Sequence, residues 1–203
     1  MKRPIIQASV LILIGILLFA GCKKDETDPQ NSFKYNDKES LIGNAFGGTL
    51  GEFNNTGVYG SMIYFLENTL TLHQSNGNPD SLSGTGDYIV LAMLGTDSAG
   101  ISPGEYKYSS SESSFAKNTF GYGESGLMIN FDATGTIDSP SLEFNGGTVT
   151  VAKNGEEYEF TFSIKTTTNS TVTGFYKGKI PMYEMFGKKK SSNQNPFRTQ
   201  FFK

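Results

Sequence analysis

TVTVAKNGEEYEFTFSIK, residues 148–165, is the stretch that decides the fold class. In its second half apolar residues alternate with polar ones, and the same period of two precedes it at Val149 and Val151. This period predicts two strands, each with one buried and one solvated face. Asn154-Gly155 separates them and accepts the positive φ angles of a type I′ turn, so the stretch predicts a β-hairpin. The alternating apolar residues of its second strand are Tyr158, Phe160, Phe162 and Ile164.

The rest of the chain has the same strand character. A loop at residues 168–170 leads into a third strand over residues 171–180, which predicts a three-stranded meander. The run Tyr88–Leu94 is apolar on both faces, so we expect it at the centre of the fold, covered on each side. No segment shows a convincing amphipathic helix. Further predicted strands, separated by Gly, Asn, Ser and Pro clusters, are Tyr59–Phe65, Thr69–Gln74, Gly104–Tyr108 and Leu127–Phe131. The sequence therefore predicts an all-β domain, an antiparallel sandwich or a calycin-like barrel of about eight to nine strands.

The N-terminus has the pattern of a signal peptide. Lys2 and Arg3 form a charged start, and an apolar run follows over residues 10–20. This run is shorter than the roughly 20 residues that a membrane-spanning helix needs. Residues 1–21 are therefore expected to be removed. Of the 203 residues, 182 would remain, enough for one domain with its own core.

The residues around Cys22 resemble the bacterial lipobox, in which small residues precede a cysteine that receives a diacylglyceryl group. Here Leu18, Phe19, Ala20 and Gly21 form the signal-peptidase motif, although the family usually has leucine where this chain has Phe19. The resemblance implies a lipoprotein with covalent lipid on Cys22. Two or more acyl chains hold a protein stably on a membrane. Cys22 is the only cysteine, so the folded domain is expected to contain no disulfide.

The residues after the cysteine, Lys23, Lys24, Asp25 and Glu26, resemble a surface-export signal of some Gram-negative lipoproteins. This implies an outer-membrane protein displayed at the cell surface. The alternative is a solvated tether on the periplasmic face. We expect the lipidated cysteine and tether to span residues 22–40, the β domain residues 41–186 and a basic disordered tail residues 187–203.

Charge is distributed unevenly along the chain. Without Lys2 and Arg3, 15 basic and 20 acidic residues give a net charge of −5. Residues 22–187 hold 10 of the basic and all 20 acidic residues, because five cations lie in the last part of the chain. A body with this acidic balance would repel phosphate, so no nucleic-acid partner is expected.

The predicted closing strands look like those of small β-rich envelope lipoproteins of Gram-negative gut-type bacteria. The resemblance rests on residues 146–151, the hairpin above and a following Gly-x-Tyr-x-Gly segment at 174–178, and upstream on Pro103-Gly104-Glu105-Tyr106. It covers residues 41–183. It implies a lipid-anchored β domain of the outer membrane and transfers no catalytic residue.

Two groups of residues are candidates for ligand binding. Asn76, Asn78, Asp80 and Asp87 match positions of a calcium-loop template, although the template glycine is replaced by serine and no helix flanks the loop. The long loop over residues 109–126 carries Phe115, Phe120 and Tyr122, which could present aromatic faces to a ligand. A plain surface loop is the favoured interpretation of the first group. Apart from the lipid, no cofactor is expected.

Catalytic patterns are sparse. His73 is the only histidine, and its neighbours predict that it lies on the solvated face of a strand. Two hypotheses of function follow. The first is a non-enzymatic, lipid-anchored β domain that binds an unknown ligand or envelope protein or supports the envelope. The second is a carboxylate-dependent glycan hydrolase, or a glycan-binding accessory protein. Two carboxylates in one cleft would favour the hydrolase.

Overall fold

The computed structural model describes residues 29–110, 115–121, 125–132 and 141–184. Every regular element in these ranges is a strand, so the all-β prediction is confirmed and the barrel alternative is correct. Within the same ranges, no helix could serve as a membrane span. The strands are β1 (Ser32–Tyr35), β2 (Lys38–Glu52), β3 (Tyr59–Glu67), β4 (Thr71–Ser75), β5 (Asn78–Ser83), β6 (Thr85–Gly95), β7 (Gly104–Tyr108), β8 (Thr119–Phe120), β9 (Gly126–Asp132), β10 (Leu142–Asn154), β11 (Glu157–Thr166), β12 (Thr171–Lys179) and β13 (Met182–Glu184).

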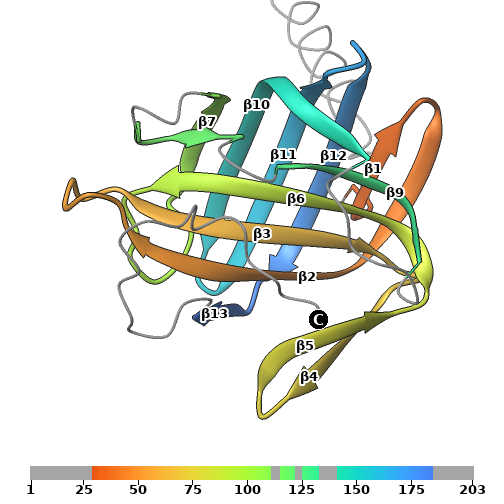
Figure 1. Cartoon of the computed structure of the whole chain (residues 1–203), viewed down its shortest axis with the longest axis horizontal. Coiled ribbons are helices and arrows are strands. Elements are labelled where there is room, and N and C mark those ends of the chain that lie inside the picture. The colour runs from red at the N-terminus through yellow and green to blue at the C-terminus, as the bar shows by residue number, and fades with distance from the viewer. Residues whose placement is uncertain (1–28, 111–114, 122–124, 133–140, 185–203) are drawn as a thin grey trace, which may run out of the picture.

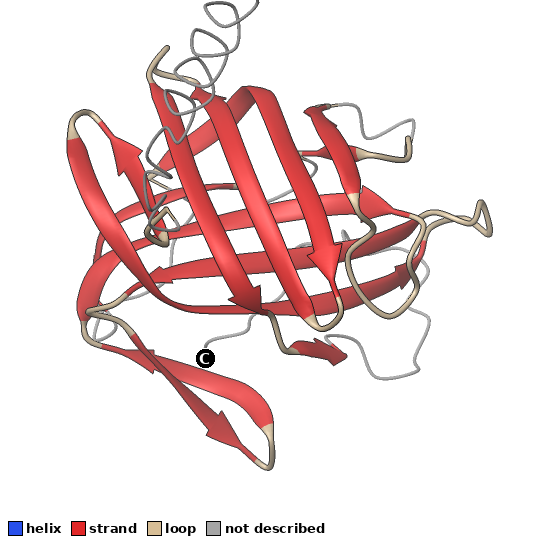
Figure 2. Ribbon diagram, turned by 180° about the vertical axis from the view of Figure 1, so that it is seen from behind, coloured by secondary structure: helices blue, strands red, loops and turns tan. Residues whose placement is uncertain are grey.

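The large sheet closes on itself. Its strand order is β1-β12-β11-β10-β7-β8-β6-β3-β2, and β1 also pairs with β2, which completes the circle. Ser32 lies opposite both Leu41 of β2 and Phe175 of β12, so a strand of four residues joins the two sides. β9 bridges β6 and β10, and β13 adds to β2 in parallel. Figure 1 shows β2, β3 and β6 crossing in front of β10, β11 and β12, and Figure 2 shows the latter three from behind.

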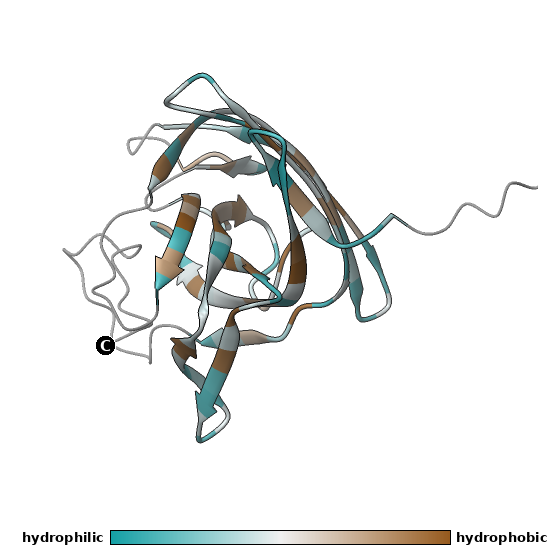
Figure 3. Ribbon diagram, turned by 90° about the vertical axis from the view of Figure 1, so that its right-hand side faces the viewer, coloured by the Kyte–Doolittle hydropathy of each residue, from teal (hydrophilic) through white to brown (hydrophobic). Residues whose placement is uncertain are grey.

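The closed sheet has two apolar faces along β2, β3 and β6. The inner face belongs to the barrel core, in which Phe65 contacts Phe160, Phe162 and Tyr176 with ring centroids 5.2, 5.9 and 5.3 Å apart. The outer face forms a second buried cluster that includes Phe46 and Tyr64, stacked at 4.7 Å. β10, β11 and β12 instead alternate buried and exposed residues along most of their length. Figure 3 colours the ribbon by the hydropathy of each residue. This difference explains why Tyr88–Leu94 is apolar throughout, and its predicted central position is confirmed.

The loop after β6 closes one end of the barrel. Ile101 is 2% exposed and belongs to the inner core. Ser102 Oγ accepts hydrogen bonds from the backbone N–H groups of Thr96 (2.8 Å) and Asp97 (2.9 Å). The Tyr106 hydroxyl donates to the Ser102 carbonyl at 2.7 Å, and burial raises the pKa of Tyr106 to about 12. The loop is therefore fixed across the barrel end, with Ile101 inside.

The predicted meander is present, with one shift. Tyr158, Phe160, Phe162 and Ile164 are all buried along β11. The turn before β11, however, consists of Gly155-Glu156, because Asn154 pairs with Glu157. Only Gly155 of these residues has a positive φ, 61°. The predicted position of the turn, Asn154-Gly155, is therefore wrong by one residue. The predicted type I′ is also wrong, because that turn needs two residues at positive φ and Gly155 supplies one.

The barrel begins earlier than the sequence predicts. β1 and the first residues of β2 lie inside the expected tether of residues 22–40, so the domain boundary at residue 41 is wrong. Phe33 is 2% exposed and supplies an apolar side chain to the core from a segment that is polar overall. The strands missed by the sequence analysis are β1, β2, β5, β8 and β13.

We predict that two glycines of β10 and its turn differ sharply in their tolerance of alanine. Gly147 has φ 101°, and a Cβ there would overlap the Ser163 carbonyl oxygen and lie 2.6 Å from Ile164 Cα. Gly147→Ala should therefore lower the free energy of unfolding by about 2–4 kcal/mol in urea denaturation. Gly155→Ala is the control, since no heavy atom lies within 4 Å of its Cβ position. Gly155→Ala should lower the free energy of unfolding by about 1–2 kcal/mol, the cost of placing alanine at a positive φ. Equal losses would contradict the close packing at Gly147.

Candidate functional site

The buried polar side chains of the described residues include one charged group. These side chains are Ser40, Ser61, Asp87, Ser102, Ser125 and Thr166. Asp87 is 4% exposed and lies near the start of β6, at the opposite end of that strand from the Ile101 loop. A buried carboxylate is costly unless it is paired and hydrogen-bonded, so its partners decide what it can do.

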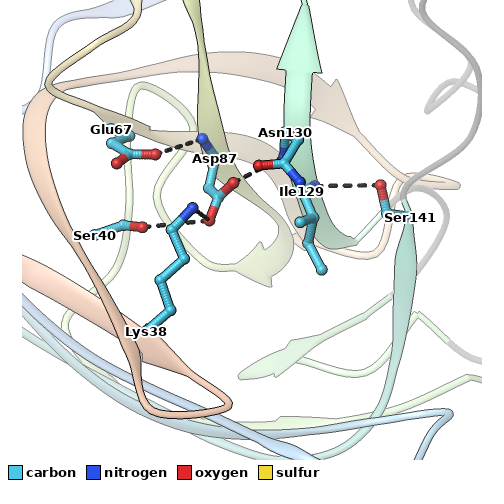
Figure 4. Close-up of polar contacts among 7 residues, drawn as sticks. All are labelled: Lys38, Ser40, Glu67, Asp87, Ile129, Asn130 and Ser141. Carbon is cyan, nitrogen blue, oxygen red and sulfur yellow. Dashed lines mark hydrogen bonds and ion pairs between the residues drawn. The ribbon is translucent and has the colours of Figure 1, made fainter.

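Asp87 is held by several strands that meet at this end of the barrel (Figure 4). Its Oδ2 accepts hydrogen bonds from Lys38 Nζ at 2.8 Å and from Ser40 Oγ at 3.3 Å, both on β2. Its Oδ1 accepts from the backbone N–H of Asn130 on β9 at 2.8 Å. Its own N–H donates to Glu67 Oε2 at the end of β3, at 2.6 Å. The carboxylate thus links β2, β6 and β9, and the backbone beside it is fixed by β3.

The local sequence explains this arrangement. The pairing of β3 with β6 ends at Leu66 and Tyr88, and just beyond it the Asp87 side chain reaches Lys38 and Ser40 of β2. The pairing of β6 with β9 shifts register between Gly86 and Tyr88, where Asp87 alone faces Ile129 and Asn130, so β9 is the bulged strand. A bulge re-aims a side chain relative to regular alternation. Asn130, within this bulge, has φ 52°, a conformation that asparagine tolerates better than most residues.

The hydrogen bonding makes Asp87 a structural carboxylate. Both of its oxygens are engaged, whereas a general base or nucleophile needs an oxygen that faces a substrate. The hydrogen bond to Asp87, with the charges of Asp87 and Glu67, raises the pKa of Lys38 above its ordinary value, so Lys38 is charged at neutral pH. Lys38 remains half-exposed, with 49% of its side chain accessible. In this group Asp87 and Ser40 are buried at the barrel end, whereas Lys38, Glu67 and Asn130 are at least partly exposed to solvent.

A cleft lies at the seam between β2 and β12, where β1 begins. Asn31 fixes it: its amide side chain donates to the Lys177 carbonyl at 3.0 Å and accepts from the Lys177 N–H at 2.7 Å. The Asn31 carbonyl also accepts from the Ile42 N–H at 2.9 Å. The hollow has a volume of about 790 Å³. Its lining residues are Pro29, Gln30, Asn31, Leu41, Ile42, Gly43, Asn68, Glu157 and Lys177, with Glu157 as the single acidic one.

The predicted aromatic loop residues do not form one site. Phe115 packs on the outer cluster, with its ring centroid 4.6 Å from that of Phe53. Phe120 is 1% exposed and lies in the inner core, where its ring centroid is 5.8 Å from that of Tyr108. The two rings therefore belong to opposite faces of the barrel wall. Tyr122 lies outside the described residues.

The residues of the calcium template are also separated. Asn76, Asn78 and Asp80 are exposed on the β4–β5 hairpin, whereas Asp87 is buried in β6 and bonded to Lys38, Ser40 and Asn130. Within the described ranges, no group of three or more His, Cys, Asp and Glu side chains could hold a metal ion. His73 is exposed on β4, as predicted, and its Nε2 lies 2.6 Å from Ser83 Oγ.

The anchor residues lie outside the described part of the chain. These are the signal-peptidase motif Leu18, Phe19, Ala20 and Gly21, the lipidation residue Cys22, and the export-signal residues Lys23, Lys24, Asp25 and Glu26.

Sequence reasoning missed the partners of Asp87 and the clamp at Asn31. One signal was present: Asp87 is an acidic residue directly before a run that is apolar on both faces. Burial of that run makes a buried, paired carboxylate the expected outcome. The identity of its partners depends on the barrel closure, which no local pattern encodes. Asn31 was assigned to the tether because its neighbours are polar.

No protein-family model, curated protein or solved structure matches the chain. Function is therefore argued from the residues and the barrel geometry.

We predict that Asp87 stabilises the barrel. Asp87→Ala removes the acceptor for three donors and should lower the free energy of unfolding by about 3–5 kcal/mol in urea denaturation. Asp80→Ala is the matched control, because Asp80 is an exposed carboxylate on the hairpin, and it should change stability by less than about 0.5 kcal/mol. Similar losses for both variants would show that Asp87 is not a link between strands.

The Lys38–Asp87 pair should also give a specific pH dependence. A raised pKa in the folded state stabilises the fold below the unfolded-state pKa, and this stabilisation is lost as pH rises through the folded-state pKa. Lys38→Gln should lower the free energy of unfolding by about 1 kcal/mol at neutral pH. The difference in unfolding free energy between wild type and variant should shrink once the pH exceeds 10.5. Lys34→Gln is the control, since Lys34 and its partner Asp37 are exposed. A Lys38→Gln cost that does not change with pH would refute the ion-pair contribution.

Proposed function

We propose that the chain is a lipid-anchored protein of the Gram-negative outer membrane, displayed at the cell surface and attached through Cys22. In this proposal, the barrel binds a ligand or an envelope partner through its outer surface and catalyses no reaction. The observation that carries the proposal is the lipobox-like segment at residues 18–22, followed by a short polar connector.

The start of the barrel supports a close attachment to the membrane. Nine residue steps separate Cys22 from Asn31, whose three hydrogen bonds fix it to β2 and β12. A fully extended connector of this length spans at most about 30 Å. An acylated Cys22 would therefore keep the seam side of the barrel within that distance of the lipid headgroups.

Because the barrel interior is filled by side chains, a ligand or partner is expected to bind at the outer surface. The inner core is filled by aromatic and aliphatic side chains, and Phe65 alone contacts three other rings across it. One end carries the Ile101 loop and the other the Asp87 group. Barrels that carry a small ligand keep an interior space for it, whereas packed barrels are filled by their own side chains. The outer surface is thus the better candidate for contact with a partner.

The polar groups of the seam cleft favour binding over hydrolysis. A glycosidase needs two carboxyl groups across a bound sugar, about 5–10 Å apart. The seam cleft is lined by one acidic residue, Glu157, and Asp87 is hydrogen-bonded at both oxygens. The β4–β5 hairpin, which projects from the barrel in Figure 1, offers a second exposed surface.

Cys22→Ser tests the anchor. The wild-type chain should incorporate labelled palmitate and remain in the membrane fraction, because acyl chains supply its anchoring. The Cys22→Ser chain should be unlabelled, keep its signal peptide and lose the lipid-dependent membrane retention. For the wild type, protease applied to intact cells should remove the barrel.

Two outcomes would contradict the proposal. Equal labelling, size and membrane retention of wild type and Cys22→Ser would refute the lipid anchor. A wild-type barrel that survives protease on intact cells, but is cut once the outer membrane is opened, would refute surface display and leave the anchor intact.

A further inference from the structure

We propose that the C-terminal segment, residues 185–203, covers the outer apolar face of β2, β3 and β6 with its phenylalanines. This inference rests on the proposed removal of residues 1–21 but not on the lipid at Cys22. The outer apolar face is defined by the residues of the second buried cluster on those strands, which are Phe46, Met62, Tyr64, Leu66, Tyr88, Val90, Ala92 and Leu94.

The outer apolar face is buried, although no described strand lies across it. Met62, Ala92 and Leu94 are 1%, 0% and 2% exposed. Figure 1 looks onto this side of β2, β3 and β6, and no described strand passes in front of them; β13 and the β4–β5 hairpin lie along its border. Phe53 and Phe115 add to the cluster from loops. Apolar side chains this well buried need a covering layer.

Composition singles out the C-terminal segment as that layer. The internal stretches outside the described ranges are 111–114, 122–124 and 133–140, and their large apolar residues are Tyr122 and Ile137. Residues 1–28 also lie outside these ranges, but 1–21 are the expected signal peptide and 22–28 contain no large aliphatic or aromatic residue. The segment 185–203 contains five: Met185, Phe186, Phe197, Phe201 and Phe202. A face of this size is better matched by several aromatic side chains than by two isolated residues.

The last described strand brings the chain to the outer apolar face. β13 pairs with β2 in parallel, with Tyr183 opposite Gly48. The Tyr183 ring meets Phe46 edge-on with centroids 6.5 Å apart, and its hydroxyl accepts a hydrogen bond from Gln74 Nε2 at 2.7 Å. Thirteen residue steps from Glu184 to Phe197 span up to about 43 Å, more than the roughly 36 Å length of β6. The segment therefore starts beside the face and can reach all of it.

Charge favours the same contact. Lys188, Lys189 and Lys190 open the segment, and Arg198 and Lys203 follow. Residues 22–187 carry 10 basic and 20 acidic residues, so the basic segment is attracted to the rest of its own chain. A second copy of the barrel would present the same acidic surface and would be repelled.

The sequence provides a clean probe of this contact. The arginines of the chain are Arg3 and Arg198, so an arginine-specific protease should cut the mature chain only after Arg198. The probe is the mature chain in its native membranes, and the readout is the rate of release of the peptide Thr199–Lys203 by mass spectrometry. Isolated peptides of residues 185–203 from each variant give the intrinsic cleavage rate.

We predict that cleavage of the wild-type chain is at least about tenfold slower than cleavage of its peptide, because the bound segment must first detach. The triple variant Phe197→Ser, Phe201→Ser and Phe202→Ser should be cut at nearly the rate of its own peptide. The matched control Asn193→Ser, Gln194→Ser and Asn195→Ser changes as many positions in the polar spacer and should stay protected.

Other results would overturn the proposal. Wild-type cleavage at the rate of the peptide would mean that the phenylalanines are free, and an oligomeric wild type in that case would identify a second copy as the cover. Protection that persists in the phenylalanine variant would mean that these side chains do not hold the segment.

Discussion

The pairing of β1 with both β12 and β2 is the constraint on which the rest of the structure depends. An open sheet of this length would expose two edges of unpaired N–H and C=O groups, and closure removes both. Four residues make the connection, from Ser32 to Tyr35, and Phe33 adds a buried ring. Closure also brings β2 close to β6 beyond the end of β3, which lets Asp87 reach Lys38 and Ser40. Without this closing strand, neither the inner core nor the Asp87 group could form.

Closure divides the barrel wall into two kinds of sheet. β10, β11 and β12 bury one face and expose the other, whereas β2, β3 and β6 are apolar on both. The second kind needs cover from outside, which we propose that residues 185–203 supply. The packed interior leaves the outer surface, the seam cleft and the β4–β5 hairpin for contacts with other molecules. These are the surfaces through which the proposed ligand or partner would bind.

The sequence predicted what depends on local periodicity. The alternation along β11, the central position of β6 and the exposure of His73 follow from neighbours in the chain, and all are confirmed. β2 was missed because Gly43, Gly47, Gly48 and Gly51 interrupt its apolar pattern, and β1 because a single buried ring, Phe33, stands in a polar stretch. The partners of Asp87 come from strands up to 49 residues away, so no local pattern could show them. The same separation explains why Phe115 and Phe120, neighbours in one loop, lie on opposite faces.

Native-state hydrogen exchange of the β1 amides tests the closed barrel most directly. If β1 completes the sheet, the amides of Phe33 and Tyr35 should exchange only through global unfolding, as slowly as those of β11 and β12. The exposed β4–β5 hairpin supplies the fast reference within the same molecule. Exchange of the β1 amides at the rate of the hairpin would mean that the barrel is open at this seam and would contradict the account.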